Sequence, residues 1–319
     1  MKKGNIPVLN IVGRTIPEVY EKALRMVWKK GARIKTEYDK PEDPASRDAT
    51  VAITILEPFG QPRFHRSFAD GLGALGEYVM EVIFGAHDYW IKPIKEVLKG
   101  DKSKDTKWTY TYHQRLFNYL IEGKKINQID YLVSKLAQTG HSRRAQAITW
   151  NTRLDPPTSE PPCLQRIWAR ICQDEQGGLI FNMNTHWRSR DLFKAWFENV
   201  IAITGLMRKI ADMVSEKIDK PIKLGRYVDI SDSLHIYGSY FSEIEGDSDR
   251  GVKSFFENLE SRSFEKRTWH SDFVKPFFIN DGTGKGLEPM LGREKDMPAG
   301  VRTAIQNELE LMKQDDYVV

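Results

Sequence analysis

The longest regular pattern in this chain of 319 residues is a run of apolar side chains between residues 192 and 218. Its members recur at the spacing of one helix face: Ala195, Val200, Ile203, Leu206, Met207, Ile210, Met213 and Val214. The pattern predicts a central, largely buried helix, because so broad an apolar face needs cover on most sides. Directly before it, residues 167–171 and 179–187 flank Gly177-Gly178 and predict a hairpin. Together these elements indicate an α/β fold, with a large mixed sheet and helices on one side.

Shorter patterns predict the other elements. We expect strands at residues 6–12, 51–56, 145–150 and 228–237, and within residues 108–116, where aromatic residues alternate with threonines. We expect helices at residues 19–30, 70–84 and 127–137, and near 251–260 and 298–314. Residues 36–49 are polar and contain prolines, which predicts a loop. The chain becomes charged and Gly- and Pro-punctuated past residue 246. We therefore expect a catalytic domain over residues 1–245 and a C-terminal extension or lid over residues 246–319.

Composition limits the classes of function. The two cysteines, Cys163 and Cys172, are too few for a disulfide framework or a metal site, and indicate a reducing, cytoplasmic compartment. A net charge of +4 is too weak to argue for nucleic acid as an obligatory partner, but it is compatible with an anionic ligand. No run of residues is apolar and long enough for a signal peptide or a membrane span, so we expect neither.

Cys163 is the first candidate for chemistry. Pro161 and Pro162 fix the backbone before it and exclude a helix there. A thiol presented in this way, with cationic side chains nearby to stabilise the thiolate, is a candidate nucleophile. The alternative is a buried cysteine with a structural role.

Other polar residues suggest what such a thiol could attack. Arginines and a serine suit a phosphate dianion, since the guanidinium offers forked donors; they are Arg143, Arg144, Arg188 and Ser189. The amide of Asn199 can both donate and accept, so it can read the edge of a pyrimidine base. His235 and Tyr237 fall on one side of a strand, where they could hold a sugar hydroxyl. Glu77 and Glu81 share one helix face, and either could be a buried acid or base.

The arrangement of these residues resembles the thymidylate synthase family, in the wide sense that includes the pyrimidine-nucleotide hydroxymethylases. The matching segments are SRR (142–144), Trp150-Asn151, PPC (161–163), RSxD (188–191), Asn199 and HIY (235–237). The resemblance implies a homodimer that packs through the open face of its sheet. It also implies 5,10-methylenetetrahydrofolate as the cofactor and a uracil nucleotide, by preference dUMP, as the substrate.

The resemblance assigns a role to each nucleotide-binding residue. It implies that Arg188 and Ser189 bind the phosphate in their own subunit, whereas Arg143 and Arg144 reach the nucleotide of the neighbouring subunit. Asn199 would read the base, and an acidic residue can replace it in family members that act on cytosine nucleotides. His235 and Tyr237 would hold the sugar.

It also assigns the reacting groups. Cys163 would attack carbon 6 of the ring, with Tyr112 near the thiol. Glu77 or Glu81 would organise water and protons, and the alignment leaves both open. Asp191 would contact the pterin of the folate, and no metal is implied.

The sequence departs from the family pattern in several places. Leu164 follows the cysteine where many synthases have His, and Trp187 stands where Gln is common. These features are similar to a divergent archaeal or phage-type branch that also contains hydroxymethylases. Two alternatives to deoxyuridylate methylation therefore stay open. One is 5-hydroxymethylation of a uracil or cytosine nucleotide, with water in place of hydride. The other is a non-catalytic relative that binds a nucleotide or RNA.

Overall fold

The computed structural model describes residues 4–68, 70–91, 108–241 and 252–319. Among them the main feature is an eight-stranded sheet with the order β1-β3-β11-β9-β8-β7, to which β2 and β10 are added on β3 and β11. Its strands are β1 (Val8–Gly13), β2 (Ala32–Ile34), β3 (Ser46–Ile55), β7 (Gln146–Ile148), β8 (Leu164–Gln173), β9 (Leu179–Trp187), β10 (Arg190–Asp191) and β11 (Ile222–Ile236). Strand β11 runs antiparallel to β3 and parallel to β9, so the sheet is mixed, as predicted.

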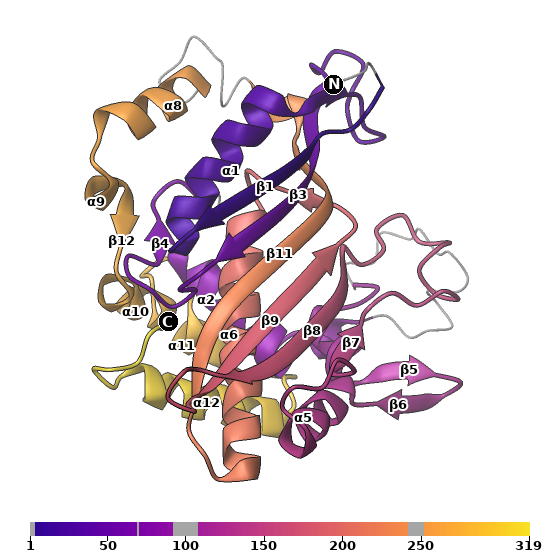
Figure 1. Cartoon of the computed structure of the whole chain (residues 1–319), viewed down its shortest axis with the longest axis vertical. Helices are drawn as coiled ribbons and strands as arrows, with labels where there is room; N and C mark the ends of the chain where they lie inside the picture. The colour runs from indigo at the N-terminus through magenta and orange to yellow at the C-terminus, as the bar shows by residue number, and fades with distance from the viewer. Residues whose placement is uncertain (1–3, 69, 92–107, 242–251) are drawn as a thin grey trace.

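The long helix is α6 (Trp196–Ile218), which is central and largely buried, as its pattern predicts. It packs against α2 (Leu72–Phe84) and α5 (Gln128–Gln138), and α1 (Ile16–Lys30) covers β1 and β3 on the same side of the sheet. Figure 1 shows these helices behind the strands. Alternate side chains of β1, β3, β9 and β11 are buried on this side, so the main core lies between the sheet and the helices.

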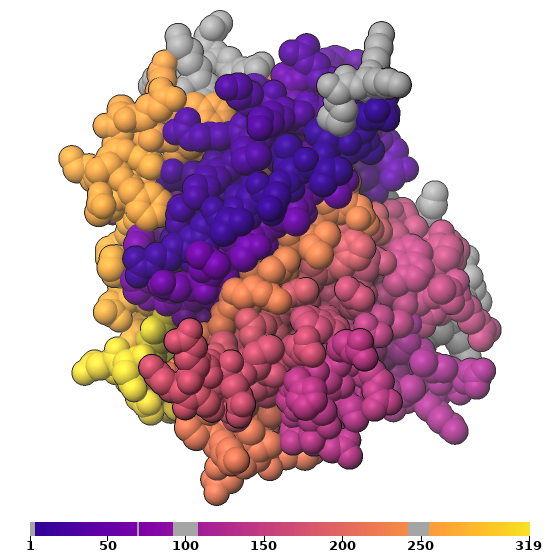
Figure 2. Space-filling model, viewed as in Figure 1, coloured from indigo at the N-terminus to yellow at the C-terminus, as the bar shows by residue number. Residues whose placement is uncertain are grey.

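The other face of the sheet carries no helix in the part of the chain that the structure describes, and its strands form the front surface in Figure 2. Two rows of side chains cross it: Val12, Thr54, Val228, Asn184, Trp168 and Gln146, then Asn10, Ala52, Ile230, His186, Arg166 and Ile148. Val8, Val12 and Ile148 are 78%, 47% and 42% exposed. Apolar side chains therefore share this uncovered face with polar ones such as Asn184, His186 and Arg166.

The C-terminal part adds a set of short helices beside α1 and α2. These are α8 (Val252–Ser261), α9 (Phe264–Arg267), α10 (Ser271–Ile279), α11 (Leu287–Arg293) and α12 (Ala299–Met312). Helices α10, α11 and α12 contact α2, and β12 (Thr268–Trp269) pairs with β4 (Phe64–His65). The predicted helices near residues 251–260 and 298–314 are confirmed, whereas α10 and α11 were not expected. The predicted domain boundary after residue 245 lies outside the described residues.

Two local predictions are wrong. Within residues 108–116 the structure has no extended strand but an isolated bridge at Trp108, followed by helix α4 (Tyr112–Phe117). The Thr111 hydroxyl accepts a hydrogen bond from the Gln114 amide at 2.9 Å, and this helix cap outweighs the alternation of aromatic residues. The expected loop over residues 36–49 ends early, because β3 already begins at Ser46. There it pairs with β2, and Arg47 pairs with Ile236 of β11. A small hairpin of β5 (Tyr119–Ile121) and β6 (Lys124–Ile126) follows α4.

Candidate active site

The Pro-Pro-Cys segment is fixed by the residue that follows strand β9. The backbone amide of Arg188 donates to the Cys163 carbonyl at 2.9 Å. The guanidinium of Arg188 donates to the carbonyls of Pro162 and Pro161 at 3.1 and 2.7 Å. One arginine therefore holds the loop in place and brings a positive charge to the thiol.

The thiol of Cys163 is partly buried, and two effects on its pKa oppose each other. Burial raises the pKa above its ordinary value, because it disfavours the thiolate, whereas the guanidinium groups of Arg188 and Arg190 lower it. Burial is the larger effect, and the carboxylate of Glu160 adds to it. In this structure the thiol is therefore protonated at neutral pH.

Tyrosine side chains surround the thiol. The pKa values of Tyr38, Tyr110, Tyr112 and Tyr237 are raised, with burial as the main cause, and a thiolate at Cys163 would raise each of them further. For Tyr237 the raised pKa is about 12. Tyr112 packs edge-on against the Trp187 indole, with ring centroids 5.6 Å apart. The structure thus places Tyr112 beside the thiol, and Tyr237 as well, although the two residues lie on different elements.

The two candidate glutamates lie in different surroundings, although they share a helix face. Glu81 lines a cavity of about 330 Å³ together with Tyr110, Tyr112 and Glu160. Its carboxylate lies 2.9 Å from Nδ1 of His87, and burial raises its pKa. Glu77 instead accepts hydrogen bonds from the Gly286 amide at 2.9 Å and from the Arg293 guanidinium. Glu81 therefore belongs to the cavity wall near the thiol, whereas Glu77 joins α2 to α11.

Asn199 lies in the first turn of α6, and both ends of its amide are engaged. Its Oδ1 accepts from Nε of Arg190 at 3.2 Å, and its Nδ2 donates to the Tyr78 hydroxyl at 2.7 Å. The Arg190 guanidinium is paired with the buried carboxylate of Asp229 and stacks on Trp187, 3.6 Å from its ring centroid. Sequence reasoning missed both Tyr78 and Arg190. For Arg190, an available signal was a charged residue at the variable position of Arg-Ser-x-Asp.

The candidate residues for sugar and folate binding lie at the end of β11. His235 and Tyr237 have ring centroids 4.4 Å apart. The His235 Nδ1 lies 3.2 Å from the Ser233 hydroxyl, and its buried Nε2 has no hydrogen-bond partner among the described residues. Asp191 accepts from the backbone amides of Phe193 and Lys194 at 2.9 and 3.0 Å, and from the Tyr240 hydroxyl at 3.0 Å. An unpaired buried imidazole nitrogen is costly, so Nε2 is a natural place for a ligand hydroxyl.

The other two arginines lie away from this cluster. Arg143 and Arg144 are exposed, just before the edge strand β7, and neither guanidinium makes a hydrogen bond to the residues that the structure describes. Ser142 is buried and its hydroxyl accepts from the Arg144 amide at 3.2 Å. Ser189 is half-buried, next to Arg188. Within a single chain, Arg188 and Arg190 therefore lie near the thiol, whereas Arg143 and Arg144 are exposed to solvent.

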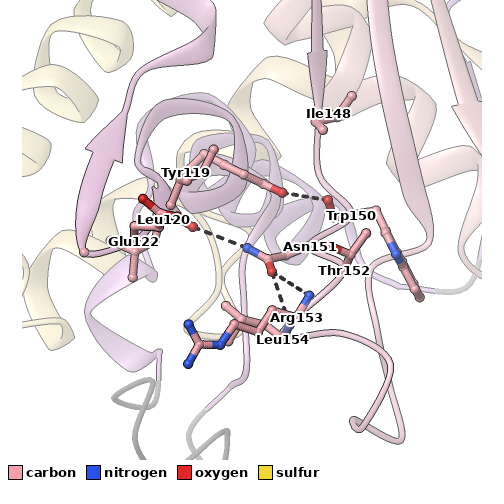
Figure 3. A pocket seen from close by; sticks show the side chains of 11 residues that line it. Tyr119, Leu120, Glu122, Ile148, Trp150, Asn151, Thr152, Arg153 and Leu154 are labelled. Carbon is pink, nitrogen blue, oxygen red and sulfur yellow. Dashed lines mark hydrogen bonds between the residues drawn. The ribbon is translucent and has the colours of Figure 1, made fainter.

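A second, larger cavity of about 560 Å³ lies between the β5–β6 hairpin and residues 150–154. Figure 3 shows that the amide of Asn151 is already used within this wall. It donates to the Leu120 carbonyl at 3.3 Å and accepts from the Arg153 and Leu154 amides at 3.1 and 3.2 Å. None of the candidate site residues lines this cavity, so it does not compete with the site around Cys163.

The described ranges carry neither a metal cluster nor a membrane-spanning helix. No group of three or more His, Cys, Asp or Glu side chains in these ranges is placed to hold a metal ion. Within the same ranges, no helix is both long and apolar enough to span a bilayer.

Comparison with known proteins identifies the family of the chain. The model of the family described as "Thymidylate synthase" matches residues 80–272, which is more than half of the chain. A protein of Methanocaldococcus jannaschii named "Putative thymidylate synthase" is 28% identical over 231 residues, 70% of this chain and 88% of its own length. Proteins with the same name from Methanococcoides burtonii and Methanosarcina barkeri are 26% and 34% identical; they match 74% and 47% of this chain, and 92% and 62% of their own lengths. The chain belongs to the thymidylate synthase family.

Proposed function

We propose that this protein transfers a one-carbon unit to carbon 5 of a uracil nucleotide, most simply converting dUMP to dTMP as a thymidylate synthase. The observation that carries the proposal is the cluster around Cys163. A partly buried thiol lies near the guanidinium groups of Arg188 and Arg190. Glu160, whose carboxylate acts on this thiol, lines a cavity together with Glu81. The family match of residues 80–272 supports the same reaction class.

The thiol is the nucleophile in this proposal. The sulfur of Cys163 adds to carbon 6 of the pyrimidine, and this makes carbon 5 nucleophilic. Because burial holds the thiol in its protonated form, we expect substrate binding and the flanking guanidinium groups to be needed for its ionisation. Glu81, on the cavity wall beside Tyr112, is the group that we assign to proton transfer and water positioning at the base.

The remaining contacts fix the nucleotide. Arg188 and Ser189 would hold the phosphate, and Asn199 would hold the base. His235 and Tyr237 would hold the sugar, because the unpaired Nε2 of His235 can bond to a sugar hydroxyl. Among the described residues, this nitrogen has no hydrogen-bond partner.

The surroundings of Asp191 fit 5,10-methylenetetrahydrofolate. The carboxylate accepts from the Tyr240 hydroxyl, and the Tyr240 ring packs against that of Phe193, with centroids 6.1 Å apart. A carboxylate next to aromatic faces suits a flat heterocycle that carries amino groups, such as a pterin. When bound, the folate would supply the one-carbon unit. Asp191, with its orientation fixed by two backbone amides, would orient the ring.

The proposal includes a homodimer. The uncovered sheet face provides a continuous surface, and Arg143 and Arg144 are exposed beside its edge strand β7, where they can reach a nucleotide in a second copy. Residues 246–319 would then be an extension of the catalytic domain, since α10, α11 and α12 pack on α2.

One experiment tests the function and its variants. The protein is mixed with 5-fluoro-dUMP and methylenetetrahydrofolate, and the intact mass is measured under denaturing conditions. We expect a stable adduct of protein, nucleotide and folate, and none with Cys163→Ala. Failure of the unmodified protein to form the adduct would favour a non-catalytic binding protein. With dUMP, UMP, dCMP and CMP run side by side, the product mass then separates methylation from hydroxymethylation.

A further inference from the structure

We propose that Arg190 and Tyr78 lock the side-chain amide of Asn199 in the orientation that accepts uracil and rejects cytosine. This inference rests on the proposed function, in which Asn199 reads the base. It adds two positioning residues that fix the specificity of that reading.

The lock follows from the hydrogen-bonding chemistry of its members. A guanidinium group can only donate, so the atom of Asn199 that faces Nε of Arg190 at 3.2 Å must be the amide oxygen. The amide nitrogen then points to the Tyr78 hydroxyl, 2.7 Å away, which accepts from it. Flipping the amide would place its NH₂ group against the Nε–H of Arg190, with two donors facing each other and neither satisfied.

Arg190 is itself held too firmly to adapt. Its guanidinium pairs with the carboxylate of Asp229, and both side chains are 1% exposed. The group also stacks on Trp187, and its Nη2 donates to the Trp196 carbonyl at 3.4 Å. The donor that faces Asn199 therefore has a fixed position, set by strand β11 on one side and by the start of α6 on the other.

The locked amide matches only one of the two pyrimidines. Uracil presents an N3–H donor and an O4 acceptor, and these can meet the second lone pair of Oδ1 and the second hydrogen of Nδ2. Cytosine presents an N3 acceptor and an N4 amino donor. Its N3 would then face the acceptor Oδ1, and its amino group would face the donor Nδ2. Unpaired donors and acceptors in a desolvated site distinguish two ligands far more strongly than a small difference in ligand shape does.

Arg190 also links base reading to the nucleophile. Arg190 follows Arg188 by two residues, and the backbone amide of Arg188 donates to the Cys163 carbonyl at 2.9 Å, while Nε of Arg190 faces Asn199. The charge of Arg190 also lowers the pKa of the Cys163 thiol. A base held by the locked amide is thereby positioned relative to the sulfur.

The test compares nucleotide binding without folate, so that it does not depend on turnover. The dissociation constants of dUMP and dCMP are measured by calorimetry for the unmodified protein, Arg190→Lys and Tyr78→Phe. Lysine keeps a positive charge for Asp229 but removes the planar Nε donor. We expect the preference for dUMP to fall at least tenfold in Arg190→Lys, since the amide can then flip. We expect a fall of about threefold in Tyr78→Phe, since the amide nitrogen loses the partner that holds it in place. Binding of deoxyribose 5-phosphate, which lacks the base, should change less than twofold.

The outcomes distinguish the lock from the base-reading role of Asn199. An unchanged dUMP preference in Arg190→Lys overturns the lock, and if that variant does not fold, an unchanged preference in Tyr78→Phe overturns it. Asn199→Ala separates the lock from the proposed function. If this variant abolishes the preference while Arg190→Lys keeps it, Asn199 reads the base without a lock. If Asn199→Ala leaves the preference unchanged, the base-reading role itself is wrong.

Discussion

Cys163 illustrates how a single residue takes its chemistry from neighbours on other elements. The thiol follows two prolines, yet the positive charges beside it come from Arg188 and Arg190, after strand β9. Burial raises its pKa and the guanidinium groups oppose this effect. The reactivity of the thiol should therefore respond to the loss of either positive charge.

This gives a prediction for the thiol's titration. In a Cys172→Ser background, the rate of alkylation of Cys163 by iodoacetamide is followed against pH. We expect a midpoint above the ordinary pKa of a cysteine, and a further upward shift in Arg188→Gln, because the thiolate loses its nearest positive charge. Arg170→Gln, on the far part of β8, is the matched control and should leave the midpoint unchanged. A downward shift in Arg188→Gln would contradict the electrostatic argument.

The two glutamates of α2 give a second prediction. Glu81→Gln should reduce kcat by about 10²- to 10⁴-fold, the usual contribution of a general acid or base, with little change in the melting temperature. Glu77→Gln should instead leave kcat within about threefold and lower the stability by about 1–2 kcal/mol, because it weakens the partly exposed contact with Arg293. Both variants are compared by steady-state kinetics and thermal melts. The reverse pattern would move the catalytic role to Glu77.

These residues also show what a sequence can reveal. Cys163, Asn199 and Asp191 could be selected because they lie in short motifs, whereas Glu77 and Glu81 could not be separated, since both lie on one helix face. The difference comes from Arg293, which lies 216 residues after Glu77 in the chain. Tyr78 was missed for the same reason: its contact with Asn199 depends on how α2 packs on α6.

At the scale of elements, the N-terminal end of α6 carries a half-buried carboxyl group, that of Glu198, which makes the stability depend on pH. Burial, with the nearby carboxylates of Asp70 and Asp191, raises the pKa of Glu198 to about 8. The folded protein therefore keeps a proton that the unfolded chain releases, and this contribution to stability is lost as the pH rises from about 4.5 to 8.

We therefore expect Glu198→Gln to stabilise the protein in a pH-dependent way. Its melting temperature should equal that of the unmodified protein near pH 4.5 and exceed it at pH 8, because glutamine carries no charge to bury. Glu216→Gln, an exposed change near the other end of the same helix, is the control and should show the same difference at both pH values. A gain that appears only at low pH would be the wrong sign for this explanation.

The elements themselves were predictable where the signal is local. The periodicity of α6 predicts the helix, but not its start at Trp196. Before that start, the Asp191 carboxylate accepts from the Phe193 and Lys194 amides and forms a turn. The cap at Thr111 starts a helix over residues 112–117 and so ends the alternation of residues 108–112. Strand β3 begins at Ser46 because β2 and β11 pair with it, and neither partner has a signal in the loop sequence. Long-range pairing is what local patterns cannot show.

At the scale of the whole molecule, the single chain explains most of the site but not Arg143 and Arg144. Both are exposed next to the sheet face that the described helices leave uncovered. A second copy packed on this face would bury Val228 and Ile230 and bring the exposed arginines toward a neighbouring site. The proposed dimer would therefore complete the active site as well as cover the sheet face.

Mixing two inactive variants tests this arrangement directly. Arg143→Ala/Arg144→Ala retains its own thiol but lacks the arginines for its partner, and Cys163→Ala retains the arginines but lacks the thiol. If sites are shared, a heterodimer of the two contains one site with both the thiol and the partner's arginines. Equal mixing after mild dissociation should then restore about one quarter of the wild-type activity, since half of the random dimers are mixed and each has one complete site of two. Ile230→Glu in both variants places a charge on the uncovered face. It should prevent the recovery and give the mass of a monomer in light scattering. If mixing restores no activity although light scattering still shows dimers, each subunit must complete its own site. Arg143 and Arg144 would then have another role.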